Sequence, residues 1–300
     1  MKNSIIKGIG AGALLLLVLS ITEASAQLNP MGSLYFQNRY LGNPAMAGTE
    51  KGLDLNLGFR QQWSNIPGSP AIQTLTADYG LNDKVGLGLN IYNDKSGLFS
   101  RTRSVASFAY HLPLGGEEQH LSFGLSLGFM NERIMLENMD GDPNDVVASN
   151  FNDRDTYVDG DFGIAYSGER FTFQAALPNM KSYFKKDINT SSVDRSTFYS
   201  AASYKLSLSE GVGGFGLEPM IAYRGVKGMD NIIDAGANLT YDERLNLFGM
   251  YHSSKSATIG IGMKYLSFGI NGMYTTATSA LRNYANGNFE VSLSMRLLKK

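Results

Sequence analysis

The chain has 300 residues and a formal net charge of −1, so it lacks the basic excess that nucleic-acid binding requires. It contains no cysteine, which excludes a disulfide framework and thiolate chemistry. Its 34 glycines, 16 tyrosines and 16 phenylalanines against 8 prolines favour β-strands with small side chains on one face and aromatic rings on the other. We therefore expect an all-β protein with no nucleic-acid partner.

The N-terminus has the order of a secretory signal peptide. Lys2 and Lys7 give a positive start, residues 9–21 are almost purely apolar, and Ala24-Ser25-Ala26 supplies the small residues that signal peptidase recognises. As a helix the apolar stretch spans about 20 Å, less than the roughly 30 Å of a hydrocarbon core. We therefore expect residues 1–26 to be a signal peptide that is cleaved after Ala26.

No later stretch approaches 18 consecutive apolar residues, so the exported chain has no predicted transmembrane helix. The periplasm, the cell exterior and an outer-membrane β-barrel remain as destinations.

Residues 27–51 form a lead-in that is too apolar for a solvated linker, and its prolines prevent a long helix or strand. We expect it on the periplasmic side, packed into the mouth or lumen of a barrel. Two interpretations stay open: an intramolecular plug, or a docking surface for a periplasmic partner. The candidate partner-binding residues here are Tyr35, Phe36, Tyr40, Asn43 and Pro44.

Residues 52–300 alternate between apolar and polar or small side chains, as barrel strands do. Phe123 and Leu125, for example, alternate with Ser122, Gly124 and Ser126. The predicted segments start near Gly52, Ala71, Lys84, Ser104, Gln119, Tyr157, Arg170, Thr197, Gly213, Asn231, Glu243, Lys255, Leu266 and Asn288. We predict a transmembrane antiparallel β-barrel of about 14 strands; a soluble β-sandwich or a two-domain secreted β protein is the alternative.

The connections alternate in length, as they do where outer-membrane barrels have short periplasmic turns and longer outside loops. The short ones are residues 80–83, 113–118, 167–169, 209–212 and 241–242, and the long ones 61–70, 131–156, 178–196 and 275–287. This pattern predicts an even strand number, both chain ends of the barrel in the periplasm, and location in the outer membrane.

The residues that could carry chemistry are few. We expect His111, His120 and His252 to be solvated near strand ends, because they lack metal-ligand spacing. The protein is therefore predicted to be no enzyme and to need no cofactor. Trp63 is expected to be an interfacial anchor, with contact to a secreted partner as the alternative.

An acidic stretch resembles the start of a calcium loop. Asp140, Asp142 and Asn144 offer oxygen ligands at alternate positions, but Asp145 and Phe151 stand where the loop needs Gly and Glu. A hydrated acidic loop is the preferred interpretation and a calcium site the weaker one.

Several short motifs carry a family resemblance. Residues 37–48, QNRYLGNPAMAG, resemble the N-terminal "NPAYAG" signature of the PorP/SprF family of Bacteroidetes outer-membrane proteins. The segments FRQQW at 59–63, VGLGL at 85–89 followed by NDKSG at 93–97, and ALPNM at 176–180 are similar to further family elements.

This resemblance implies a barrel component of the type IX secretion system, which exports proteins and in many members drives gliding motility. It implies partners beyond outer-membrane lipid: a periplasmic OmpA-like peptidoglycan-binding lipoprotein, type IX motor-ring proteins, and a secreted cargo or surface adhesin. Two other functions remain open. One is a passive transporter or porin for small or hydrophobic solutes; the other, an outer-membrane hydrolase, would need a partner for His252.

Overall fold

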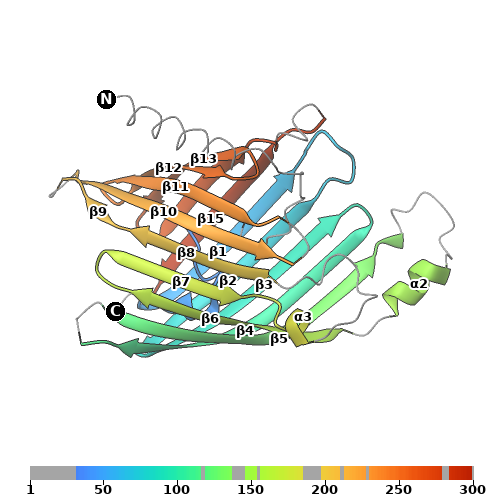
Figure 1. The fold of residues 1–300 in the computed structure, drawn as a ribbon, viewed down its shortest axis with the longest axis horizontal. Coiled ribbons are helices and arrows are strands. Elements are labelled where there is room, and N and C mark those ends of the chain that lie inside the picture. Colours follow the sequence, from blue (N-terminus) through green and yellow to red (C-terminus); the bar gives the residue numbers. More distant parts are fainter. Residues whose placement is uncertain are drawn as a thin grey trace, which may run out of the picture.

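The computed structural model describes residues 32–115, 119–136, 146–153, 156–184, 197–209, 213–227, 230–278 and 284–298. Their strands form one antiparallel sheet, which closes into a barrel because β1 pairs with β15 and β10 pairs with β11 (Figure 1). The predicted signal peptide lies outside these residues. Within them, no helix combines the length and apolar character needed to cross a membrane.

The elements follow one another around the barrel in chain order. The first half comprises η1 (Pro44–Met46), β1 (Gly52–Gln62), β2 (Ala71–Asn82), β3 (Val85–Ser96), β4 (Phe99–Pro113), β5 (His120–Ile134), α2 (Val146–Asn152), β6 (Tyr157–Ser167) and β7 (Phe171–Leu177). The second half comprises α3 (Lys181–Phe184), β8 (Thr197–Tyr204), β9 (Leu206–Ser207), β10 (Phe215–Val226), β11 (Ile232–Tyr241), β12 (Leu245–His252), β13 (Ser256–Tyr265), β14 (Phe268–Thr275) and β15 (Asn288–Leu297).

The two-residue strand β9 continues β8 after a break at Lys205. Both segments pair with β10. β8 pairs with residues 220–226 of β10, and β9 pairs with Gly216 and Leu217. Pro219 stands opposite the break, where its missing N–H cannot bond to a neighbouring strand. Counting β8 and β9 as one, the described residues form fourteen barrel strands, so the predicted fold is confirmed.

The alternation of side chains separates a lipid face from a lumen face. On β5, Leu125 and Leu127 point outward and are 55% and 64% exposed, whereas Ser122 and Ser126 point inward and are buried. In water such an apolar outer surface would be costly, but in a bilayer it is the solvated face. The buried apolar core lies inside the barrel instead, between the wall and residues 32–48.

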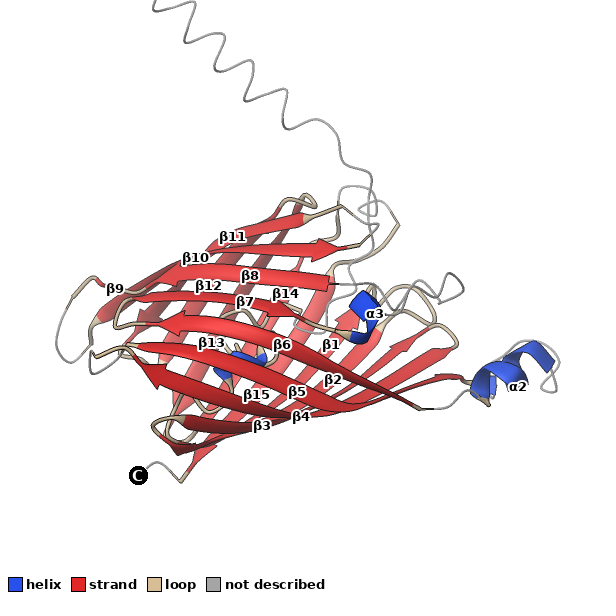
Figure 2. Cartoon of the chain, turned by 60° about the horizontal axis from the view of Figure 1, so that its bottom comes forward, coloured by secondary structure: helices blue, strands red, loops and turns tan. Residues whose placement is uncertain are grey.

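The two ends of the barrel differ in their connections. One end, which we call the short-turn end, has turns such as 83–84, 168–170 and 266–267. At the opposite, long-loop end lie residues 63–70 and the described parts of three longer connections, 135–136, 146–153, 178–184, 276–278 and 284–287 (Figure 2). Two tight turns, 97–98 and 253–255, also lie there.

One predicted boundary is wrong. β4 begins at Phe99, five residues before the predicted Ser104, and β3 continues to Ser96. Residues 93–96 continue β3 as strand paired with the start of β4, as far as the tight turn that Gly97 makes with a φ of 59°.

Candidate functional site in the barrel lumen

Residues 32–48, which we call the plug, run through the lumen from the long-loop end to the short-turn end. At the first end the Ser33 amide donates to Glu290 Oε2 at 2.8 Å, close to the start of β15. At the other end the Gly48 amide donates to Asp78 Oδ2 at 2.9 Å, towards the end of β2. Helix η1 is visible within the barrel in Figure 2. The plug therefore crosses the lumen rather than merely covering one mouth.

The middle of the plug is bound to opposite walls. The Asn38 side-chain amide donates to Thr76 Oγ1 of β2 at 2.9 Å. The next residue, Arg39, forms an ion pair with Glu218 of β10, on the other side of the sheet order. Such contacts on both sides fix the plug laterally in the lumen.

The family signature at residues 43–48 builds the turn that seats the plug. The Asn43 Oδ1 caps η1 by accepting the Ala45 amide at 2.9 Å, and Pro44 has the fixed φ suited to the first helical position. The Asn43 side-chain amide then donates to the carbonyls of Ile164 (3.2 Å) and Ala175 (3.3 Å). One side chain thus shapes the turn and ties it to β6 and β7.

Glycines on the wall make room for this turn. At four inward-facing positions on β3, β5 and β6, a Cβ atom would overlap an atom of the plug. These positions are Gly86, Gly88, Gly124 and Gly163. The small inward-facing residues at these positions are therefore the places where the plug meets the wall.

A buried charged group holds Tyr35 near the long-loop end. Asp234, which is fully buried, accepts two hydrogen bonds from Arg224 at 2.7 and 3.0 Å and one from the Tyr35 hydroxyl at 2.7 Å. His252 Nδ1 also lies 2.6 Å from Asp234, and His252 Nε2 lies 2.7 Å from Thr258 Oγ1.

The expectation of solvated histidines is wrong for His111 and His252, each only 4% exposed. Both point into the lumen and use both ring nitrogens; His111 lies between Ser122 Oγ (2.8 Å) and the Ala47 carbonyl (3.1 Å). His252 does have companions, in the acid–histidine–hydroxyl order of a hydrolase. However, the hydroxyl of Thr258 is shared with Thr275 at 2.7 Å, and Arg224 and Tyr35 occupy the carboxylate.

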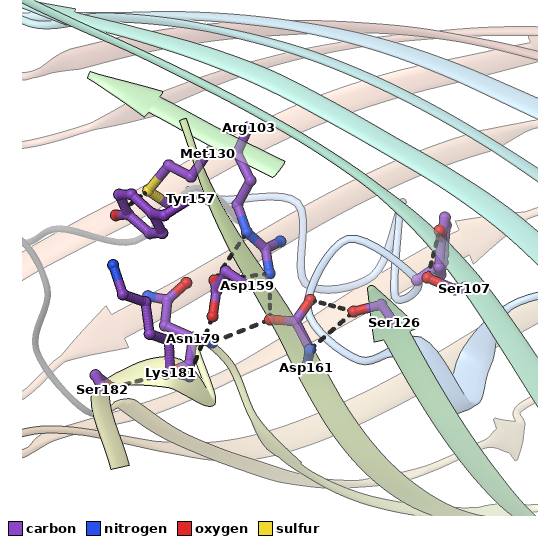
Figure 3. A network of polar contacts seen from close by, with 11 residues as sticks. Arg103, Ser107, Ser126, Met130, Tyr157, Asp159, Asp161, Asn179, Lys181 and Ser182 are labelled. Atoms are coloured by element: carbon purple, nitrogen blue, oxygen red, sulfur yellow. Dashed lines mark hydrogen bonds and ion pairs between the residues drawn. The ribbon is translucent and has the colours of Figure 1, made fainter. Parts of the chain in front are cut away.

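A second chain segment packs against the inside of the barrel wall at the long-loop end. Figure 3 shows the charged residues that hold it. Arg103 of β4 binds Asp161 at 2.6 Å and Asp159 at 3.2 Å, both on β6. The backbone amide of Asn179 donates to Asp161 (3.0 Å), and the backbone amide of Lys181 donates to Asp159 (3.2 Å). The family-like segment at 176–180 and the start of α3 are therefore folded inward onto the charged wall.

The structure separates the residues predicted as candidates. Tyr35, Tyr40, Asn43 and Pro44 are buried in the plug, and Phe36 packs against Phe248 with ring centroids 6.1 Å apart. Trp63, in contrast, is the half-buried first residue of the loop that follows β1. Asp140, Asp142 and Asn144 lie outside the described residues, and the described part of the chain brings together no group of three acidic, histidine or cysteine side chains that could hold a metal.

Sequence reasoning missed the wall residues that hold the plug, among them Asp78, Glu218, Asp234 and Glu290. Each carries a carboxylate at an inward position of a strand whose outward neighbours are apolar or small. A charge at such a position was the available signal, because a charged side chain inside a barrel needs a partner.

A closed barrel with an apolar outer face and a plug from its own chain is an integral outer-membrane protein. Its sequence matches the family described as Type IX secretion system membrane protein PorP/SprF over residues 24–295. The chain belongs to the PorP/SprF family, and the resemblance and the outer-membrane location are confirmed. No curated protein sequence matches it significantly.

Solved barrels are similar only distantly. The Acinetobacter baumannii outer-membrane protein Omp33 is 9% identical with a TM-score of 0.48, over 83% of this chain and all of that one. The monoaromatic hydrocarbon channel CymD is 11% identical with a TM-score of 0.49, over 93% and 96%. A deltaS2 mutant of the monoaromatic hydrocarbon channel TodX is 11% identical with a TM-score of 0.48, over 88% and 95%.

Proposed function

We propose that this protein is a non-enzymatic, non-conducting anchor of the type IX secretion or gliding machinery in the outer membrane. The observation that carries the proposal is the number of barrel strands to which the plug is bound. Its wall partners are Thr76 in β2, Ser107 in β4, Ile164 in β6, Ala175 in β7, Glu218 in β10, Asp234 in β11, Thr275 in β14 and Glu290 in β15. A lumen crossed by a segment that is bonded to so many strands supports a structural role over a conducting one.

The surface proposed for a periplasmic partner is the short-turn end. Thr49, Glu50 and Lys51 are exposed where the chain leaves the plug, and Lys51 Nζ lies 2.8 Å from Asp83 in the adjacent turn. The aromatic residues of the plug are buried, so they support docking indirectly, by holding this surface in place.

The partners are those that the family membership suggests. At the short-turn end we place a periplasmic OmpA-like peptidoglycan-binding lipoprotein and motor-ring proteins. At the long-loop end, which includes Trp63, we place a secreted cargo or adhesin. The apolar outer face contacts outer-membrane lipid.

A gentle detergent pull-down of tagged protein from cell envelopes, with mass spectrometry of what is retained, tests the proposal. We expect the lipoprotein and ring subunits to be recovered with the wild type and lost with Glu50→Lys/Lys51→Glu, which exchanges two exposed charges without touching the plug. Lys95→Glu, exposed at the long-loop end, is the matched control and should retain them.

A protein that is recovered alone, and that admits solute into liposomes, would contradict the anchor. That result would favour the passive transporter instead.

A further inference from the structure

The plug leaves a cavity of about 590 Å³ unfilled at the short-turn end. It lies between the ends of β8 to β11, and the turn residues Ser209, Asp242 and Glu243 line its mouth. Deeper, it is lined by the inward-facing side chains of Glu218 and Asn238.

The position of the cavity follows from the fold. Helix η1 packs against β4, β5 and β6. The plug therefore does not cover the opposite wall between Arg39 and the short-turn end. On that uncovered wall, the break between β8 and β9 opposite Pro219 adds space, and Lys205 and Leu206 at the break line the cavity.

The chemistry of the cavity favours a cation with N–H donors. The carboxylate of Glu218 is shared between Arg39 and the Ser203 hydroxyl, which donates to it at 2.7 Å. Asn238 Oδ1 is buried and has no hydrogen-bond donor among the described residues, and an orphaned buried acceptor is costly. Glu243 adds negative charge at the mouth, whereas Lys205 is the one basic residue in the lining.

We propose that this cavity binds a guanidinium- or ammonium-bearing side chain of a polypeptide presented from the periplasm, in competition with Arg39 for Glu218. A guanidinium can bond a carboxylate and a neighbouring carbonyl together, which would satisfy Glu218 and Asn238 Oδ1 at once. The volume lies within the usual range of ligand sites and exceeds what a single guanidinium fills, so it accommodates adjoining backbone. This proposal goes beyond the anchor role, because it assigns a binding site that does not depend on which proteins the barrel anchors.

The test is isothermal titration of the full-length purified protein in detergent with the tripeptide acetyl-Gly-Arg-Gly-amide. The matched probe carries citrulline, which has the shape of arginine without its charge. We expect the citrulline peptide to bind at least about tenfold more weakly, since charge-assisted hydrogen bonds are roughly twice as strong as neutral ones. N-propylguanidinium, which has the charge and head group of the arginine side chain without any peptide backbone, should also bind more weakly than the arginine peptide.

Variants separate competition from simple charge attraction. Glu218→Gln should weaken binding about tenfold, and Arg39→Ala should tighten it several-fold because Glu218 is then free. Asn238→Ala, which leaves the Arg39–Glu218 pair intact, should also weaken binding, so the test does not depend on the folding of one variant. Glu169→Gln, which removes an exposed acid at the same end outside the cavity, is the control and should change nothing.

Equal binding of the two tripeptides, or binding that Glu218→Gln leaves unchanged, would overturn the cation site. No tightening in Arg39→Ala would overturn the competition. N-propylguanidinium binding as tightly as the peptide would overturn the polypeptide as its occupant.

Discussion

Buried carboxylates on the barrel wall hold the segments that close the lumen. Asp234 accepts a hydrogen bond from Tyr35 of the plug, Asp78 from the Gly48 amide, and Asp161 from the Asn179 amide of the inward loop. Burying a charge costs free energy that its partners only offset, so such groups add little net stability. Their contribution is to define where the plug and the loop sit.

Removing one member of the group around Asp234 tests this at a single site. Asp234→Ala leaves Arg224 buried without its carboxylate and should lower the free energy of unfolding by about 3–5 kcal/mol. Tyr35→Phe removes one hydrogen bond to a charged acceptor and should cost about 1.5–3 kcal/mol. Urea unfolding in detergent micelles, followed by the fluorescence of the single tryptophan, measures both.

Tyr251→Phe is the control, because Tyr251 lies on the lipid face and is 58% exposed. It should leave the unfolding free energy unchanged. If Tyr35→Phe behaves in the same way, the hydroxyl contributes nothing to holding the plug.

At the scale of elements, strand β6 contacts both segments that lie inside the barrel, the plug and the inward loop at residues 178–181. Its residues Asp159 and Asp161 bind the inward loop, and two positions further on Gly163 lies against the Asn43 turn of the plug. A shift of β6 would therefore disturb both segments together.

A side chain at a wall glycine should unseat the plug. A Cβ at Gly124 would overlap the Ala45 backbone, so Gly124→Leu should push η1 from the wall. Arg39 would then become accessible, and limited trypsin digestion should cut there at least about tenfold faster than in the wild type, since proteolysis needs locally opened chain.

Gly272→Leu is the matched control, because a Cβ at this lipid-facing glycine has no atom within 4 Å. It should keep the wild-type cleavage rate. Equal protection of Arg39 in both variants would show that the plug does not depend on this contact.

The strands could be predicted from the sequence and the path of the plug could not. Alternation is local, so strands such as β5 are visible in a few residues, and the polar start of β4 was placed five residues too late. The plug is placed by contacts between distant residues; Tyr35 and Asp234, for instance, are 199 residues apart in sequence. The histidines were misjudged for the same reason, because their partners lie on other strands or in the plug.

The molecule as a whole has a direction in the membrane that can be tested because it contains no native cysteine. Outer-membrane barrels keep short turns in the periplasm. We therefore predict that Ser64→Cys, exposed at the long-loop end, reacts with a membrane-impermeant maleimide on intact cells. Thr49→Cys, exposed at the short-turn end, should react only after the outer membrane is permeabilised. The reverse pattern would place the plug exit and the cation cavity at the cell surface.

The central claim is that the barrel is closed by its own N-terminal segment, and planar-bilayer conductance of the purified protein tests it most directly. The wild type should insert without a steady ion current, and Gly124→Leu should conduct because its plug is displaced. A wild-type protein that conducts steadily, at the level of its Gly124→Leu variant, would show that the plug does not seal the lumen and would contradict the account.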